Sequence, residues 1–203
     1  MELISAAVLA GGMSSRLGFP KAWLRLGSGR TLIEDTVAKL RRLSDDVMVV
    51  ANEPAFEVRG ARRVADLVPG AASLGGIHTA VARAKRDRVV VVGCDMPFLS
   101  IRLLSYLVSL SSEVDVVAPR IEGYPEPLHA VYGRGCLPAI EPRARGGQLK
   151  IIGFYADVRV RYVDEPELRR IDPELRSFRN VNTPELVQEA LAIIEREGVG
   201  VLG

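Results

Sequence analysis

Residues 3–21 constrain the fold of this chain more than any other stretch. They begin with a short apolar run, typical of a strand that is covered on both faces. A loop follows, with glycine at positions 11, 12 and 18 and with two cations, Arg16 and Lys21. Glycine lets a main chain pass close to a ligand, and successive N–H groups in such a loop form a concavity that binds anions. A strand leading into this loop predicts a nucleotide phosphate site at the carboxyl edge of an α/β sheet.

Two familiar phosphate loops do not fit these residues. A dinucleotide fingerprint requires Gly-x-Gly-x-x-Gly, and that spacing does not occur here. A Walker loop has four residues between its glycines, whereas five separate Gly12 from Gly18, and Pro20 comes directly before Lys21. From these residues alone, a glycine-rich turn with scattered surface cations stays open as the alternative.

The composition is that of an ordinary globular protein. With 203 residues, 48% of them hydrophobic and 26% charged, the chain is expected to form a single domain over residues 1–203. The net charge is +2 with both signs interspersed, so no nucleic-acid partner is predicted.

The sequence indicates a cytoplasmic protein without a membrane partner. No stretch approaches the roughly 18 uncharged apolar residues of a membrane span, and no basic region precedes the first apolar run. The two cysteines, Cys94 and Cys136, form neither a metal-spaced set nor a disulfide framework. Cys94 ends an apolar strand and is expected to be a core residue rather than a nucleophile.

The first half of the chain alternates between helices and strands. Thr31 and Glu34 form a capping box that predicts a helix over residues 31–43, and residues 46–51 read as a second buried strand. Asn52 follows that strand at the expected ligand edge. Base or ribose contacts and an ordinary turn are equally compatible with its position.

A second glycine-rich segment follows a short strand at residues 62–65. It runs from Asp66 to a helix expected over residues 76–84. The Gly75–Gly76 pair is predicted to lie near the amino terminus of that helix, where main-chain N–H groups can meet a ligand.

Four consecutive valines at residues 89–92 predict a central strand, and Asp95 lies just past its end. A carboxylate there is costly unless it is solvated, paired or bound to a metal. Magnesium takes one or two protein carboxylates and completes its shell with water and phosphate, so one aspartate is sufficient as an anchor. A capping or turn aspartate is the alternative.

The second half begins with a predicted helix at residues 100–110 and a strand at 114–119, and the alternation predicts a mostly parallel sheet. Residues 123–133 then read as a hairpin return that gives an antiparallel strand, followed by an irregular passage through residue 147. His129 in this region is expected to pack or to form hydrogen bonds rather than to catalyse. Arg143, Arg145 and Lys150 are candidates for a substrate phosphate or for solvated surface.

The chain is expected to end with an edge strand at residues 159–163 and a helix that Thr183 caps, with a frayed tail after Gly198. Helix capping accounts for Thr183, Pro184 and Glu185, but not for Asn180 and Asn182.

The first loop resembles the Leu-Ala-Gly-Gly-x-Ser-x-Arg-x-Gly-x-x-Lys signature of the molybdenum cofactor guanylyltransferase family of nucleotidyltransferases. Further matching strings occur in order at residues 49–52, 66–77, 93–98 and 178–186. The resemblance implies a three-layer α/β/α, Rossmann-like fold with a mostly parallel sheet and an antiparallel strand. The residues that fill the signature are Leu9, Ala10, Gly11, Gly12, Ser14, Arg16, Gly18 and Lys21.

The resemblance also implies roles for individual residues. Arg16, Lys21 and Asp95 are implied as catalytic groups, with Asp95 holding Mg²⁺. Phosphate contacts are implied for the loop, nucleoside contacts for Asn52, Asp66 and the turn Leu74, Gly75 and Gly76, and pterin-side contacts for Asn180 and Asn182.

The implied reaction transfers GMP from GTP to the phosphate of molybdopterin and releases pyrophosphate, and molybdoenzyme-maturation proteins are implied as partners. Pro20 departs from the family pattern, because Pro-Lys is common in cytidylyltransferases of isoprenoid synthesis. A cytidylyltransferase or sugar-phosphate nucleotidyltransferase of the same superfamily is therefore the first alternative. A non-catalytic nucleotide-binding protein that delivers the cofactor is a second alternative, from a different class.

Overall fold

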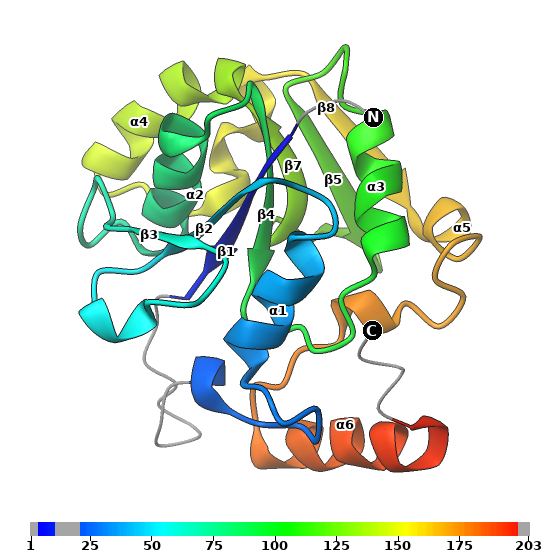
Figure 1. The fold of residues 1–203 in the computed structure, drawn as a ribbon. Helices are drawn as coiled ribbons and strands as arrows, with labels where there is room; N and C mark the ends of the chain where they lie inside the picture. Colours follow the sequence, from blue (N-terminus) through cyan, green and yellow to red (C-terminus); the bar gives the residue numbers. More distant parts are fainter. Residues whose placement is uncertain (1–3, 11–20, 199–203) are drawn as a thin grey trace.

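The computed structural model describes residues 4–10 and 21–198. Its strands form one sheet in the order β3-β2-β1-β4-β7-β5-β6, with β8 paired to β5 (Figure 1). The strands are β1 Ser5–Leu9, β2 Asp46–Val50, β3 Arg62–Val64, β4 Arg88–Gly93, β5 Val116–Ile121, β6 Tyr124–Pro125, β7 His129–Gly133 and β8 Val160–Asp164.

The sheet is mostly parallel. β1 pairs in parallel with β2 and β4, and β5 pairs in parallel with β8. β7 runs antiparallel to both β4 and β5, and the short β6 runs antiparallel to β5. The predicted antiparallel return at residues 123–133 and the predicted edge strand near residues 159–163 are confirmed.

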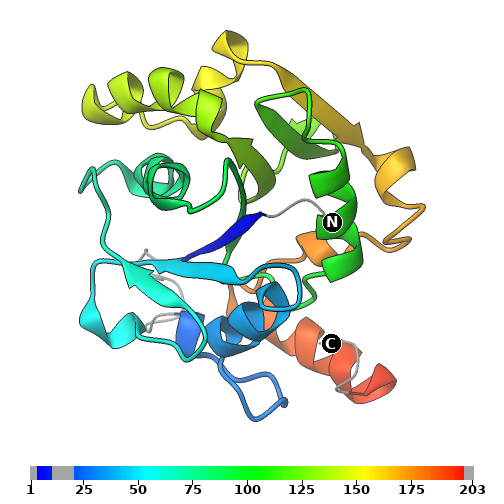
Figure 2. The same cartoon turned by 45° about the horizontal axis from the view of Figure 1, so that its top comes forward.

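Helices cover both faces of the sheet. Figure 2 shows α2 and α4 on one side of it and α1 and α3 on the other. The helices are α1 Leu32–Leu40, α2 Ala72–Arg83, α3 Ile101–Ser109, α4 Leu137–Arg145, α5 Glu165–Leu168 and α6 Pro184–Glu197, with short 3₁₀ turns η1 Lys21–Trp23, η2 Pro54–Phe56, η3 Arg134–Cys136, η4 Ile151–Asp157 and η5 Arg176–Phe178.

The core is split by the alternation of side chains along each strand. In β1, Ala6 and Val8 pack toward the α1 and α3 layer, whereas Ala7 and Leu9 pack toward the α2 and α4 layer. The expected three-layer α/β/α fold is therefore confirmed. A third cluster, which includes Leu26, Phe98 and Ile194, attaches α6 to the rest of the chain.

Two boundaries differ from the sequence expectation. The helix expected over residues 76–84 begins at Ala72. Its start was not visible in the sequence because the N-cap residue, Ala71, has no side chain that can cap a helix. The passage expected to be irregular through residue 147 contains α4, with Pro138 in its first turn and Pro142 inside it. Ile140 and Ala144 of α4 are buried against the core, and this packing outweighs the hydrogen bond that Pro142 cannot donate.

Candidate active site

The carboxyl ends of three parallel strands meet at one edge of the sheet. Leu9 of β1 is in register with Val50 of β2 and with Gly93 of β4. Asn52 and Asp95 each lie two residues beyond those positions, just after the ends of the two strands that flank β1. Because neighbouring strands are about 5 Å apart, the two ends are separated by about 10 Å, a span that one nucleotide can cover.

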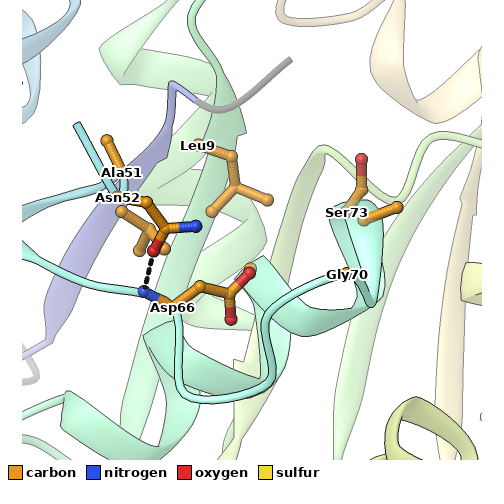
Figure 3. A pocket seen from close by; sticks show the side chains of 9 residues that line it. Leu9, Ala51, Asn52, Asp66, Gly70 and Ser73 are labelled. Carbon is orange, nitrogen blue, oxygen red and sulfur yellow. Dashed lines mark hydrogen bonds between the residues drawn. The ribbon is translucent and has the colours of Figure 1, made fainter.

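A pocket of about 380 Å³ opens beside the end of β2 (Figure 3). The main-chain N–H of Asp66 donates to Asn52 Oδ1 at 2.8 Å. Since that N–H is a donor, the amide oxygen must face it, and the Asn52 NH₂ group is left to donate elsewhere. The pocket is lined by Leu9, Val50, Ala51, Asn52, Asp66, Gly70, Ala72, Ser73 and Gly76.

One oxygen of the Asp66 carboxylate is hydrogen-bonded within the protein, and the other can accept from a ligand. Oδ1 accepts from Val68 N at 3.2 Å and from Thr79 Oγ1 at 2.8 Å. No donor within the described residues contacts Oδ2, and Figure 3 shows the carboxylate directed into the pocket. The pocket therefore presents a fixed amide donor and a fixed carboxylate acceptor side by side.

Gly75 and Gly76 lie inside helix α2 rather than in a turn before it. Gly75 N donates to Ala71 O at 3.0 Å, so its N–H is used within the helix. The N–H groups left without intrahelical acceptors are those of the first residues, Ala72, Ser73 and Leu74. The Leu74 side chain is fully buried in the core, which leaves only its main chain for a ligand.

The two glycines let the helix approach its neighbours. A Cβ on Gly75 would lie 2.9 Å from Ala71 Cβ and 3.1 Å from Asp66 Oδ2. A Cβ on Gly76 would lie 3.0 Å from Leu9 Cδ1. Gly70, Ala72 and Ser73, which sequence reasoning missed, line the pocket because the chain turns there, with Ala72 at a φ of 47°, in the left-handed region. Gly70, with a φ of 86°, was the available signal in the sequence for that turn.

Gly75→Ala is expected to lower the free energy of unfolding by about 1–3 kcal/mol, because the new methyl group has no space beside Ala71 Cβ and Val68 O. Urea denaturation checks this. Gly153→Ala is the matched control, since a Cβ there meets only Lys150 Cβ at 3.9 Å, an ordinary contact. Equal stability of the two variants would contradict the packing role.

Three residues that are distant in the sequence meet near the end of β4. Lys21 Nζ lies 3.3 Å from Asp95 Oδ2 and also donates to Asn182 Oδ1. The N–H of Val181 donates to Asp95 O at 2.9 Å, which holds the 180–182 segment against the strand end. The same segment, Asn180 and Asn182 included, also lines a second pocket of about 260 Å³ beside Phe98 and α6.

Asp95 is held close to the main chain of its own strand. Its side chain is 21% exposed, and a Cβ on Gly93 would lie 2.8 Å from Oδ1. Within the ranges that the structure describes, no group of three His, Cys, Asp or Glu side chains could enclose a metal ion. One partly exposed carboxylate fits a metal that substrate phosphates and water also ligate, as is usual for magnesium.

The described cysteines and His129 do not supply a nucleophile or a base. Burial raises the pKa of both thiols, Cys94 and Cys136, to about 12. His129 is fully buried with its ring 4.7 Å from that of Phe178, and burial lowers its pKa to about 4. Its expected packing role is confirmed.

The basic residues around α4 pair with acidic side chains or face solvent. Arg143 pairs with Asp157 at 2.6 Å and Arg145 pairs with Glu141 at 2.9 Å, while Lys150 is exposed. Ala10 is buried, and its N–H donates to Val50 O at 3.2 Å. The predicted residues Gly11, Gly12 and Arg16 lie outside the described residues.

Comparison with known proteins decides the family. A family model described as the MobA-like NTP transferase domain matches residues 6–158. The chain belongs to this family of nucleotidyltransferases. The similarity extends to the "Probable molybdenum cofactor guanylyltransferase" of Pelotomaculum thermopropionicum, which is 37% identical over 197 residues, covering 97% of this chain and 96% of the relative.

Two further relatives support this family assignment. The "Molybdenum cofactor guanylyltransferase" of Desulfosudis oleivorans is 35% identical, covering 96% of this chain and 98% of the relative. The crystal structure of "Molybdopterin-guanine dinucleotide biosynthesis protein A" from Archaeoglobus fulgidus superposes with a TM-score of 0.82 at 30% identity, covering 95% of this chain and 99% of that one. The predicted family and enzyme class are confirmed. Among the described helices, none is long and apolar enough to cross a membrane.

Proposed function

We propose that this MobA-like NTP transferase transfers GMP from GTP to the terminal phosphate of molybdopterin and releases pyrophosphate. The observation that carries the proposal is the pairing of two features at one sheet edge. A pocket with a carboxylate acceptor, Asp66, lies beside β2, and the Lys21–Asp95 pair lies beside β4. The names of the relatives, molybdenum cofactor guanylyltransferases, support guanine and molybdopterin as the substrates.

The pocket beside β2 suits guanine. Guanine presents two neighbouring donors, N1–H and the 2-amino group, and an acceptor, O6. Asp66 Oδ2 would accept from the donors, while the Asn52 NH₂ group or the free N–H groups at the start of α2 would donate to O6. Cytosine places the acceptors N3 and O2 on the same edge, and a carboxylate facing them would be repelled.

The edge beside β4 suits the triphosphate. Mg²⁺ held by Asp95 would neutralise phosphate charge and reduce the repulsion between two anionic reactants. Lys21, already directed toward Asp95, would place a positive charge near the α-phosphate and the departing pyrophosphate. Arg16, Gly11 and Gly12 are proposed to complete the phosphate contacts, and molybdoenzyme-maturation proteins stay a predicted class of partner.

The reaction needs no protein nucleophile. An oxygen of the acceptor phosphate forms a bond to the α-phosphorus of GTP, and the bond from that phosphorus to the oxygen bridging the β-phosphate breaks. The protein aligns the two reactants and stabilises the added charge, which is sufficient for an in-line displacement.

Asp66→Asn is expected to weaken GTP binding about tenfold or more, because an NH₂ group would replace Oδ2 and face the guanine donors. The remaining oxygen would still accept from Val68 N and Thr79 Oγ1, so the fold should be kept. Titration calorimetry with GTP and with ITP, which lacks the 2-amino group, checks this. The wild type should prefer GTP and the variant should lose that preference; an unchanged preference would rule out Asp66 as the acceptor.

Transfer of label from α-labelled GTP or CTP to molybdopterin tests the reaction itself. We expect transfer from GTP with Mg²⁺ present and little from CTP. Use of CTP alone would favour a cytidylyltransferase, and tight GTP binding without any transfer would favour a cofactor-delivery protein.

A further inference from the structure

A buried lysine lies beneath the loop that carries Asp95. Lys39, near the end of α1, is only 5% exposed. Burial lowers its pKa to about 8, and Asp35, one turn earlier in the same helix, offsets part of that effect. A buried ammonium group is unfavourable unless it is paired, so a residue of this kind calls for an explanation.

Lys39 makes no direct ion pair with a carboxylate among the described residues. Asp35 instead accepts from Ser28 Oγ at 2.6 Å. The described hydrogen bond of Lys39 Nζ is to the main-chain oxygen of Pro97, at 2.7 Å. This bond joins α1 to the segment between β4 and α3, which passes beside α1 in Figure 1.

Pro97 lies two residues after Asp95, in the turn that leaves β4. Because proline has no N–H, its carbonyl is the polar main-chain group through which this point of the turn can be held. Val181 holds the same turn at the other end, by donating to Asp95 O at 2.9 Å. The turn is therefore fixed at Asp95 from the 180–182 segment and at Pro97 from α1.

We propose that Lys39 is a positioning residue for Asp95. By holding the Pro97 carbonyl, it fixes the turn and keeps the Asp95 carboxylate at the position where it anchors the metal–nucleotide complex. The inference rests on the proposed function, because it assumes that Asp95 acts on the nucleotide. A lysine that only supports the fold would affect stability and leave the metal affinity of the GTP complex unchanged.

The test compares Lys39→Met with the wild type. Mn²⁺ binding is measured from the loss of the free-ion EPR signal that the protein adds to the loss caused by the same GTP without protein, alongside the melting temperature, kcat and KM. We expect a melting temperature within about 5 °C of the wild type, Mn²⁺ binding weakened about tenfold and kcat lowered about tenfold, with KM for GTP little changed. Lys85→Met, which alters an exposed lysine, is the matched control and should behave as the wild type.

Wild-type Mn²⁺ affinity and kcat in Lys39→Met would overturn the proposal, whatever its melting temperature. If that variant fails to fold, Lys39→Gln decides instead. The glutamine side chain is polar but one bond shorter than that of lysine, so it should not reach the Pro97 carbonyl, and the variant should show the same losses. A folded Lys39→Gln with wild-type affinity and kcat would equally overturn it. Absence of GTP-dependent Mn²⁺ binding in the wild type would overturn the proposed function itself, and the role of Lys39 with it.

Discussion

Asp95→Asn is expected to slow nucleotidyl transfer about 100-fold or more while the protein stays folded. The substitution preserves the size of the side chain and the main-chain bond between Val181 N and Asp95 O, 2.9 Å long. It removes the negative charge that we propose holds Mg²⁺, so the phosphate groups of the two reactants would lose their counter-charge. Rates of label transfer from GTP, measured together with the melting temperature, check both parts.

Asp87→Asn is the matched control for this prediction, because the Asp87 side chain is 91% exposed and lies just before the amino end of β4. It should transfer GMP at the wild-type rate. A wild-type rate in Asp95→Asn would remove Asp95 as the metal anchor.

Lys21→Ala is expected to lower kcat about 100-fold while KM for GTP changes much less. The Lys21 charge lies 3.3 Å from Asp95 Oδ2, where negative charge would build up on the α-phosphate and the leaving pyrophosphate. An interaction that strengthens in the transition state affects kcat, whereas the base contacts near Asn52 and Asp66 affect nucleoside binding. Steady-state kinetics separates the two effects.

The exposed Lys85 provides the control here as well, as Lys85→Ala. A Lys21→Ala variant with a raised KM and an unchanged kcat would assign Lys21 to substrate binding alone.

Much of the fold follows from local patterns in the sequence. The apolar runs that form β1, β2 and β4 are buried, and the Thr31–Glu34 capping box opens α1 as predicted. These elements were predictable because a strand buried on both faces gives a continuous apolar run, and a capping box places two characteristic residues three positions apart.

The start of α2 and the whole of α4 had no such local signal in the sequence. Ala71 does not cap α2 with its side chain, and two prolines in α4 argued against a helix that tertiary packing nevertheless supports. Local propensity is a weak guide wherever packing decides.

The residues of the candidate site also divide into those with a local signal in the sequence and those without one. Asn52 and Asp95 were placed at the ligand edge by the ends of their strands. The contact of Lys21 with Asn182, 161 residues away, and that of Lys39 with Pro97 leave no local signature. The sequence also left open which acceptor would face the base, because the direction of the Asp66 carboxylate depends on Thr79 and on the missing side chain of Gly75.

A crystal structure with GTP and Mg²⁺ tests the central claim most directly, namely that one nucleotide spans the edge from β2 to β4. The predicted result places guanine between Asn52 and Asp66, with the triphosphate beside Lys21 and the metal on Asp95. Guanine bound outside the pocket, or a metal–triphosphate that does not touch Asp95, would contradict the account.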